Sequence, residues 1–206
     1  MTTAKTLISA YGIDALTSQH PGVRKLKRQS ADPTLHGNKV WGSSWVLMDY
    51  FTSYPIAKKS RVMDIGCGWG LTGAFLAKTY EAQVLASDAD AAVAPYLDLH
   101  CDINGVEIAF EEKKYQQITV ANFTGVHTVV GADICFWEEL TQVLFNMIRR
   151  ALRAGVKQIL IADPGRPPFW ELAEICHEQL DAEIISHRIR LPKPSTKHII
   201  VIKNSD

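Results

Sequence analysis

The segment from Asp64 to Gly73 reads DIGCGWGLTG and holds residues that could bind a small ligand. It follows a short apolar run, and four of its ten residues are glycine. Because glycine has no Cβ, ligand atoms can approach the backbone closely at Gly66 and Gly68. The Asp64 carboxylate can accept a hydrogen bond from a loop N–H or reach a ligand ammonium through water. The segment therefore predicts a binding site that includes Asp64, Gly66, Cys67, Gly68 and Gly70.

A second carboxylate, Asp88, ends the next apolar run, and Ala89 follows it. Its two oxygens can accept hydrogen bonds from the vicinal hydroxyls of a ribose. The glycines also fit the GxGxxG pattern of dinucleotide binders, with Asp88 about twenty residues further on. However, Asp64 would lie near a dianionic pyrophosphate, whereas a ligand with a sulfonium and an ammonium would tolerate it. This favours S-adenosylmethionine over NAD, and an NAD-dependent oxidoreductase is the less favoured alternative.

Strand-like and helical patterns alternate along the rest of the chain and would position these residues. The expected strands are residues 61–65, 82–87, 106–110, 127–133, 158–163, 182–190 and 197–203. Helical crossovers join the first five, which predicts parallel pairing, and a short loop joins the last two, which predicts an antiparallel pair. The expected fold is α/β, a doubly wound, Rossmann-like sheet of seven strands, mostly parallel with an antiparallel C-terminal strand pair. Residues 1–40 are expected to form an N-terminal helical or irregular extension, and residues 41–206 the domain.

Composition excludes several function classes. Lys plus Arg equals Asp plus Glu at 22 each, so no nucleic-acid partner is predicted. The four cysteines form no CxxC pair, which predicts neither a metal site nor a disulfide framework. No apolar run approaches the roughly 18 residues of a membrane helix, and the first residues do not resemble a signal peptide. We therefore expect no membrane association and a cytoplasmic location.

Several motifs resemble those of a known family. RVMDIGCGWGLTGAFLA together with VLASDAD resembles the first two motifs of class I, seven-strand S-adenosylmethionine-dependent methyltransferases. ADICF resembles the acid-x-x-aromatic motif of the protein lysine methyltransferases in that class, with Asp133 and Phe136 in its two places. VWGSSWVLMDYF resembles their segment with a Trp before the glycine loop, here Trp41. IADPGRPPFWEL is similar to a stretch in the electron transfer flavoprotein β-subunit lysine methyltransferase-like enzymes.

The resemblance implies a methyl transfer from S-adenosylmethionine to the ε-amine of a protein lysine, with S-adenosylhomocysteine as product. Asp133 would orient the amine as a catalytic residue and also contact the cofactor, and the aromatic rings of Phe136 and Trp137 would face the cationic centre. The cofactor-binding set is Trp41, Asp64, Gly66, Cys67, Gly68, Gly70, Asp88, Ala89 and Asp133. The residues expected to contact the acceptor are Trp137, Asp163 and Arg166.

Other readings stay open. Asp133 could instead cap the helix that follows it, and Asp163 could only stabilise its own turn. The acceptor could be a small molecule methylated on nitrogen or oxygen, with residues 1–40 enclosing it. The chain could also be a cofactor-binding module without an acceptor site. We expect Ser43 or Ser44 to cap the helix that contains Trp45.

Overall fold

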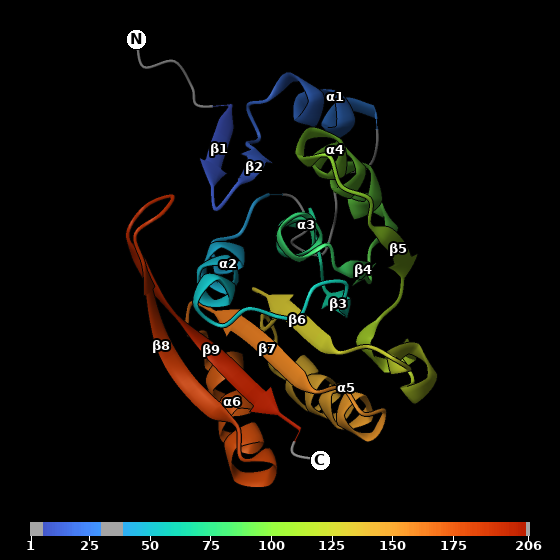
Figure 1. Ribbon diagram of the computed structural model, residues 1–206, viewed down its shortest axis with the longest axis vertical. Coiled ribbons are helices and arrows are strands. Elements are labelled where there is room, and N and C mark those ends of the chain that lie inside the picture. The colour runs from blue at the N-terminus through green and yellow to red at the C-terminus, as the bar shows by residue number, and fades with distance from the viewer. Residues whose placement is uncertain (1–5, 30–38, 205–206) are drawn as a thin grey trace.

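A seven-stranded sheet crosses the computed structural model, which describes residues 6–29 and 39–204 (Figure 1). The strand order is β5-β4-β3-β6-β7-β9-β8. The strands are β3 (Arg61–Ile65), β4 (Gln83–Asp88), β5 (Ala109–Glu112), β6 (Thr128–Ala132), β7 (Gln158–Asp163), β8 (Glu183–Ile189) and β9 (Ser195–Lys203). The strands from β3 to β7 pair in parallel, and β9 runs antiparallel to both β7 and β8. The predicted fold class is confirmed. The helical crossover expected between the third and fourth strands is wrong, because two short 3-10 turns, η2 (Tyr115–Gln117) and η3 (Val120–Phe123), join β5 to β6 in place of an α-helix.

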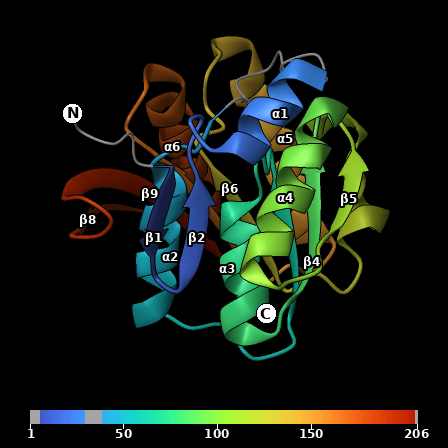
Figure 2. The ribbon, with the colours of Figure 1, turned by 90° about the horizontal axis from the view of Figure 1, so that it is seen from above.

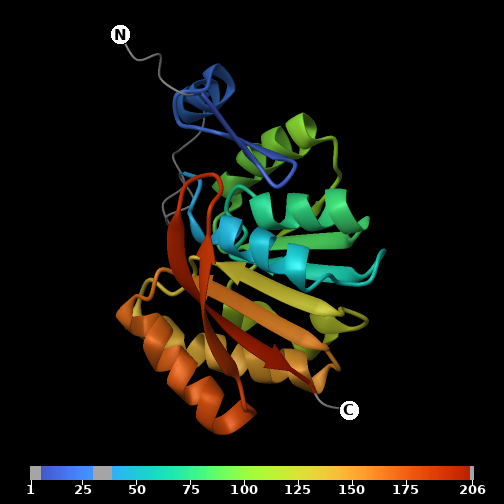
Figure 3. The ribbon, with the colours of Figure 1, turned by 60° about the vertical axis from the view of Figure 1, so that its left-hand side comes forward.

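Helices cover both faces of this sheet (Figure 3). On one face lie α2 (Ser43–Ser53), α3 (Leu71–Tyr80) and α4 (Ala94–Asn104), and on the other lie α5 (Thr141–Arg153) and α6 (Pro167–Leu180). Each face has its own hydrophobic core, one built with α2 and α3 and one with α5 and α6. Among the described residues, no helix combines the length and hydropathy that crossing a membrane requires.

Two elements differ most from the expectation, and the bounds of four other strands differ by one or two residues. The strand expected at 106–110 lies at Ala109–Glu112. Gly105 ends α4 with a left-handed φ of 65°, and the residues between it and Ala109 connect the helix to the point where pairing with β4 begins. The sequence of residues 138–155 has a helical pattern that predicts one long helix, but the structure divides it into a 3-10 turn, η4 (Glu138–Leu140), and α5. A 3-10 turn at a helix N-terminus is common, and the helical pattern in the sequence does not separate the two forms.

The N-terminal segment contains a hairpin that the sequence analysis does not expect. Strands β1 (Leu7–Ala10) and β2 (Ile13–Leu16) pair antiparallel, and α1 (Pro21–Gln29) follows them. Strand β2 lies against α3 and α4, and α1 also lies beside α4 (Figure 2). An isolated two-stranded hairpin is marginally stable, so this one depends on docking that the local sequence does not reveal. Residues 1–5 and 30–38 of the expected extension lie outside the described residues.

The parallel strands bring separate parts of the sequence to one place. In open α/β sheets, ligands bind beyond the carboxyl ends of the strands. The loop after β3, the end of β4 and the segment after β6 therefore meet at the same edge of the sheet.

Candidate active site

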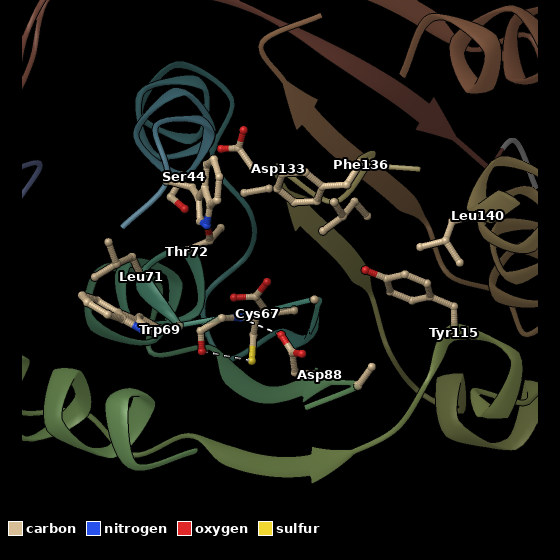
Figure 4. A pocket seen from close by; sticks show the side chains of 18 of the residues that line it. Ser44, Cys67, Trp69, Leu71, Thr72, Asp88, Tyr115, Asp133, Phe136 and Leu140 are labelled. Carbon is tan, nitrogen blue, oxygen red and sulfur yellow. Dashed lines mark hydrogen bonds between the residues drawn. The ribbon is translucent and has the colours of Figure 1, made fainter. Parts of the chain in front are cut away.

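A cavity of about 450 Å³ opens at the carboxyl ends of β3, β4 and β6 (Figure 4). Most of the predicted site residues line it, and they come from sequence positions almost a hundred residues apart. The lining includes Trp41, Asp64, Gly66, Cys67, Gly68, Gly70, Asp88, Ala89, Asp133, Phe136 and Trp137. Asp163 and Arg166 are not part of the lining.

Asp64 joins the end of β3 to helix α3. Its side chain is buried, and Oδ2 accepts a hydrogen bond from the Gly73 N–H at 3.0 Å. Gly73 lies in the first turn of α3, so the donor comes from the helix rather than from the glycine loop before it. Burial raises the pKa of Asp64 to about 7, and the hydrogen bond from Gly73 opposes this rise. The Asp64 side chain thus satisfies one of the N–H groups that a helix N-terminus leaves without an intrahelical partner.

Asp88 holds the glycine loop against the end of β4. Its Oδ2 accepts the Gly68 N–H at 3.0 Å, and its Oδ1 accepts the Asp90 N–H at 3.1 Å. Burial raises the pKa of Asp88, and these two N–H groups counteract part of that rise. Each carboxylate oxygen has a second acceptor site, so both remain able to bind a ligand hydroxyl.

Two glycines of the loop have different functions. Gly68 and Gly70 both have positive φ angles, 51° and 73°, which favour glycine. A Cβ on Gly68 would meet no atom within 4 Å, whereas a Cβ on Gly70 would lie 2.0 Å from Cδ1 of Leu97 on α4. Gly68 therefore leaves space in the cavity, and Gly70 allows α4 to pack against the loop.

Asp133 lies directly after β6 and caps the N-terminus of α2. It is 3% exposed, with a left-handed φ of 57° and its own N–H bound to the Ala162 carbonyl at 2.8 Å. Its Oδ2 accepts the Ser43 N–H at 2.7 Å, and Figure 4 shows the carboxylate pointing toward α2. The sequence analysis expected Ser43 or Ser44 as the cap, or Asp133 as a cap of its own helix. The N-cap residue is Gly42, which has no side chain, so the distant carboxylate takes this function.

Aromatic rings form the wall next to Asp133. The rings of Trp41 and Phe136 meet edge to face with centroids 5.1 Å apart, and the Trp137 ring lies 5.7 Å from Phe136. Trp137 is 39% exposed at the mouth of the cavity. The Lys39 ammonium lies 4.0 Å from the centroid of the Trp41 ring. These rings accept a cation on their faces, which is the property expected of the acceptor side.

Asp163 and Arg166 lie behind this wall. Asp163 is fully buried and accepts the backbone N–H groups of Gly165 and Arg166, each at 2.9 Å. This matches the turn-stabilising role that the sequence analysis left open. Burial raises the pKa of Asp163, and the N–H and guanidinium of Arg166 oppose the rise. Contact of either residue with an acceptor stays a prediction.

The sequence analysis missed part of the lining. The lining residues that it did not single out as cavity residues include apolar and aromatic side chains, among them Trp69, Leu71, Tyr115, Ile134 and Leu140, and the polar or charged side chains of Lys39, Ser44, Thr72, Lys114, Gln116 and Glu139. Figure 4 shows the Tyr115 hydroxyl pointing into the cavity, and a Cβ on Gly66 would lie 2.6 Å from it. Tyr115 stands in the irregular polar stretch after β5, where no pattern assigned a position. Trp69 lies inside the glycine motif, and its ring stacks on Tyr96 of α4 at 5.1 Å.

Two other types of chemistry receive little support here. Burial and the neighbouring Asp64 and Asp88 raise the pKa of the Cys67 thiol well above its usual range, so the thiolate nucleophile is disfavoured. In the ranges that the structure describes, no cluster of three or more His, Cys, Asp or Glu could hold a metal ion.

The lining fits S-adenosylmethionine. Tyr115, Ile134 and Leu140 offer an apolar surface for an adenine, and Asp88 offers paired oxygens for a ribose. Gly68 leaves space beside the backbone. The carboxyl groups of Asp64 and Asp88 lie beside the loop, where a ligand with a sulfonium and an ammonium fits better than a dianionic pyrophosphate. The fit concerns the types of residue present and their positions in one cavity.

Known proteins resemble this chain in sequence and in fold. The family model described as "Methyltransferase domain" matches residues 62–155. An electron transfer flavoprotein beta subunit lysine methyltransferase from Xenopus laevis is 28% identical over 159 residues, covering 74% of this chain and 63% of the relative. A calmodulin-lysine N-methyltransferase from Arabidopsis thaliana is 28% identical over 135 residues, covering 61% and 44%. The chain thus spans less than two thirds of the length of these relatives.

The fold has neighbours among solved structures. TrmK from M. capricolum, solved with S-adenosyl-homocysteine, superposes with a TM-score of 0.55 at 12% identity. The superposition covers 76% of this chain and 67% of that one. At this identity the likeness concerns the fold alone.

Proposed function

We propose that this chain, a class I S-adenosylmethionine-dependent methyltransferase, transfers a methyl group to the ε-amine of a lysine in a protein. The observation that carries the proposal is the position of Asp133 and Phe136. They line the same cavity as Gly68 and Asp88, although 45 or more residues separate the two pairs in the sequence. The lysine methyltransferases among the sequence relatives support this choice of acceptor.

The residues that would hold the cofactor are those of the glycine loop and the end of β4. Asp88 would accept hydrogen bonds from the ribose, and the apolar side chains of Ile134 and Leu140 would contact the adenine. When bound, S-adenosylmethionine supplies an electrophilic methyl group and leaves as S-adenosylhomocysteine. Most of the rate enhancement then comes from positioning, because an in-line displacement needs little covalent chemistry from the protein.

The acceptor side must bind a lysine amine in its neutral form. With a lysine side chain bound, the wall of Trp41 and Phe136 would exclude water from the amine, and desolvation lowers the pKa of a lysine. Asp133 would accept a hydrogen bond from the amine and stabilise the ammonium that forms. Its carboxylate is held by Ser43, so its orientation is set before the acceptor arrives.

Incubation of the purified protein with methyl-labelled S-adenosylmethionine and a cell lysate tests this proposal. We expect label in protein, on lysine after hydrolysis, and loss of transfer in Asp133→Ala with retained binding of S-adenosylhomocysteine. Glu112→Ala, an exposed acid at the end of β5, serves as the matched control and should transfer normally. Label in the small-molecule fraction alone would indicate a small-molecule methyltransferase instead.

A further inference from the structure

Two buried carboxylates follow neighbouring strands and share one cation. Asp133 follows β6 with 3% exposure, and Asp163 ends β7 with 0% exposure. Arg166 pairs with both, through Nη2 to Asp133 Oδ1 at 3.2 Å and through Nη1 to Asp163 Oδ2. Buried charges are costly unless they are paired, so the guanidinium is needed where these strands end.

The same guanidinium lies on the aromatic wall of the cavity. Its Cζ is 4.2 Å from the centroid of the Phe136 ring and 5.5 Å from that of Trp41. Arg166 itself does not line the cavity. It therefore contacts three residues that line the cavity, namely Asp133, Phe136 and Trp41, without itself being part of the lining.

We propose that Arg166 is a positioning residue for methyl transfer, which fixes the Asp133 carboxylate and the rings of Phe136 and Trp41 without contacting the acceptor. This inference rests on the proposed function for its catalytic part. Its geometric part concerns only the contacts among these four side chains.

The geometry requires arginine rather than lysine. A guanidinium is planar, donates from several nitrogens at once and can stack on a ring, whereas an ammonium is a compact point charge. Here separate nitrogens serve Asp133 and Asp163, while Cζ lies over Phe136. The backbone also fixes the residue, because the Arg166 N–H binds Asp163 and α6 begins at Pro167.

The first experiment distinguishes two functions of Arg166: it can position the Asp133 carboxylate, or it can only neutralise the charge of Asp163. We compare Arg166→Met, Arg166→Lys and the double variant Arg166→Met/Asp163→Asn. Asparagine at 163 can still accept the two backbone N–H groups but carries no charge. We expect transfer of label to lysate protein, per folded molecule, to fall at least tenfold in all three variants. Binding of S-adenosylhomocysteine, measured by calorimetry, should stay within about twofold of wild type.

The double variant should be more stable than Arg166→Met, because Asp163 no longer carries an unpaired charge. Its methyl transfer should stay low, because Asp133 still lacks the Arg166 guanidinium. Arg149→Met is the matched control, since Arg149 also lies over a ring, Phe145 at 5.9 Å, but on α5. Recovery of transfer in the double variant, or full transfer in Arg166→Lys, would overturn the inference.

A second experiment needs neither cofactor nor turnover. With fluorotryptophan incorporated, the fluorine NMR signal of Trp41 is assigned by Trp41→Phe. We expect this signal to shift or broaden in Arg166→Met but not in Arg149→Met. The signal of Trp69, across the cavity on the glycine loop, should stay unchanged in both. An unchanged Trp41 signal in Arg166→Met would contradict the geometric part of the inference. If that signal moves but wild-type protein labels no lysine, the proposed function fails and the geometry stands.

Discussion

The Gly68 N–H donates a hydrogen bond to Asp88 Oδ2 at 3.0 Å, which fastens the glycine loop after β3 to the end of β4. The same carboxylate is the group proposed to bind the ribose. Loop geometry and ligand binding therefore depend on one side chain.

Replacement of Asp88 should weaken the cofactor site more than the fold. We expect Asp88→Ala to weaken binding of S-adenosylhomocysteine by roughly 1 to 3 kcal/mol, the range for hydrogen bonds to a charged group. Calorimetry measures this change. Glu112→Ala is the control, because Glu112 is the β5 residue paired with Asp88 and does not line the cavity. Equal affinity in Asp88→Ala and wild type would mean that another group holds the ribose.

Alanine substitutions at two glycines of the same loop should have opposite results. Gly68→Ala places its methyl group in open space, so we expect a fold destabilised by only about 1 kcal/mol through its positive φ. Its binding of S-adenosylhomocysteine should fall strongly, because the methyl group takes ligand space. Gly70→Ala places the methyl group against Leu97 and should lower the unfolding temperature more. Thermal unfolding and calorimetry on both proteins test this, and tight binding by Gly68→Ala would exclude close ligand contact there.

The buried Asp64 should make stability depend on pH. Its pKa of about 7 in the folded protein exceeds the usual value of 3.8, so the folded state binds the proton more tightly. The stability that this group contributes is fully present below the unfolded pKa of 3.8 and is lost as the pH rises from there through about 7. Asp64→Asn removes the charge and can keep the bond from Gly73. We expect its stability relative to wild type to improve by about 2 to 3 kcal/mol between pH 5 and pH 8.

Denaturant unfolding at the two pH values provides this measurement. Asp98→Asn, at an exposed position on α4, should show no such change. A relative stability of Asp64→Asn that stays constant with pH would show that Asp64 is ionised throughout the range.

The N-terminal hairpin should depend on one tyrosine hydroxyl. Tyr11 lies in the turn between β1 and β2, and its hydroxyl donates to Asp49 Oδ1 on α2 at 2.8 Å. Tyr11→Phe keeps the ring beside Trp45 and removes this bond, so we expect a loss of about 1 kcal/mol in unfolding free energy. Tyr54→Phe, at an exposed ring, is the control and should change stability by less than half as much. A similar effect of both variants would show that the hairpin does not need this bond.

The alternation of strands and helices was enough to predict the sheet and its antiparallel end. Parallel strands joined by crossovers have few possible arrangements, and their carboxyl ends must meet at one edge. For that reason the glycine loop, Asp88 and the segment from Asp133 to Trp137 could be assigned to one site in advance. Tyr115 could not, because it stands in an irregular segment whose direction depends on packing around β5.

The sequence by itself determined which residue types the site contains: glycines where the backbone must approach a ligand, a carboxylate after β4, and an acid and aromatics after β6. The tertiary structure decided the partners. It placed the Asp133 carboxylate on the N-terminus of α2, ninety residues away, and Arg166 behind the aromatic wall rather than in the cavity. Periodicity and motifs report local conformation, whereas the partner of a buried charge is selected by the packing of elements distant in sequence.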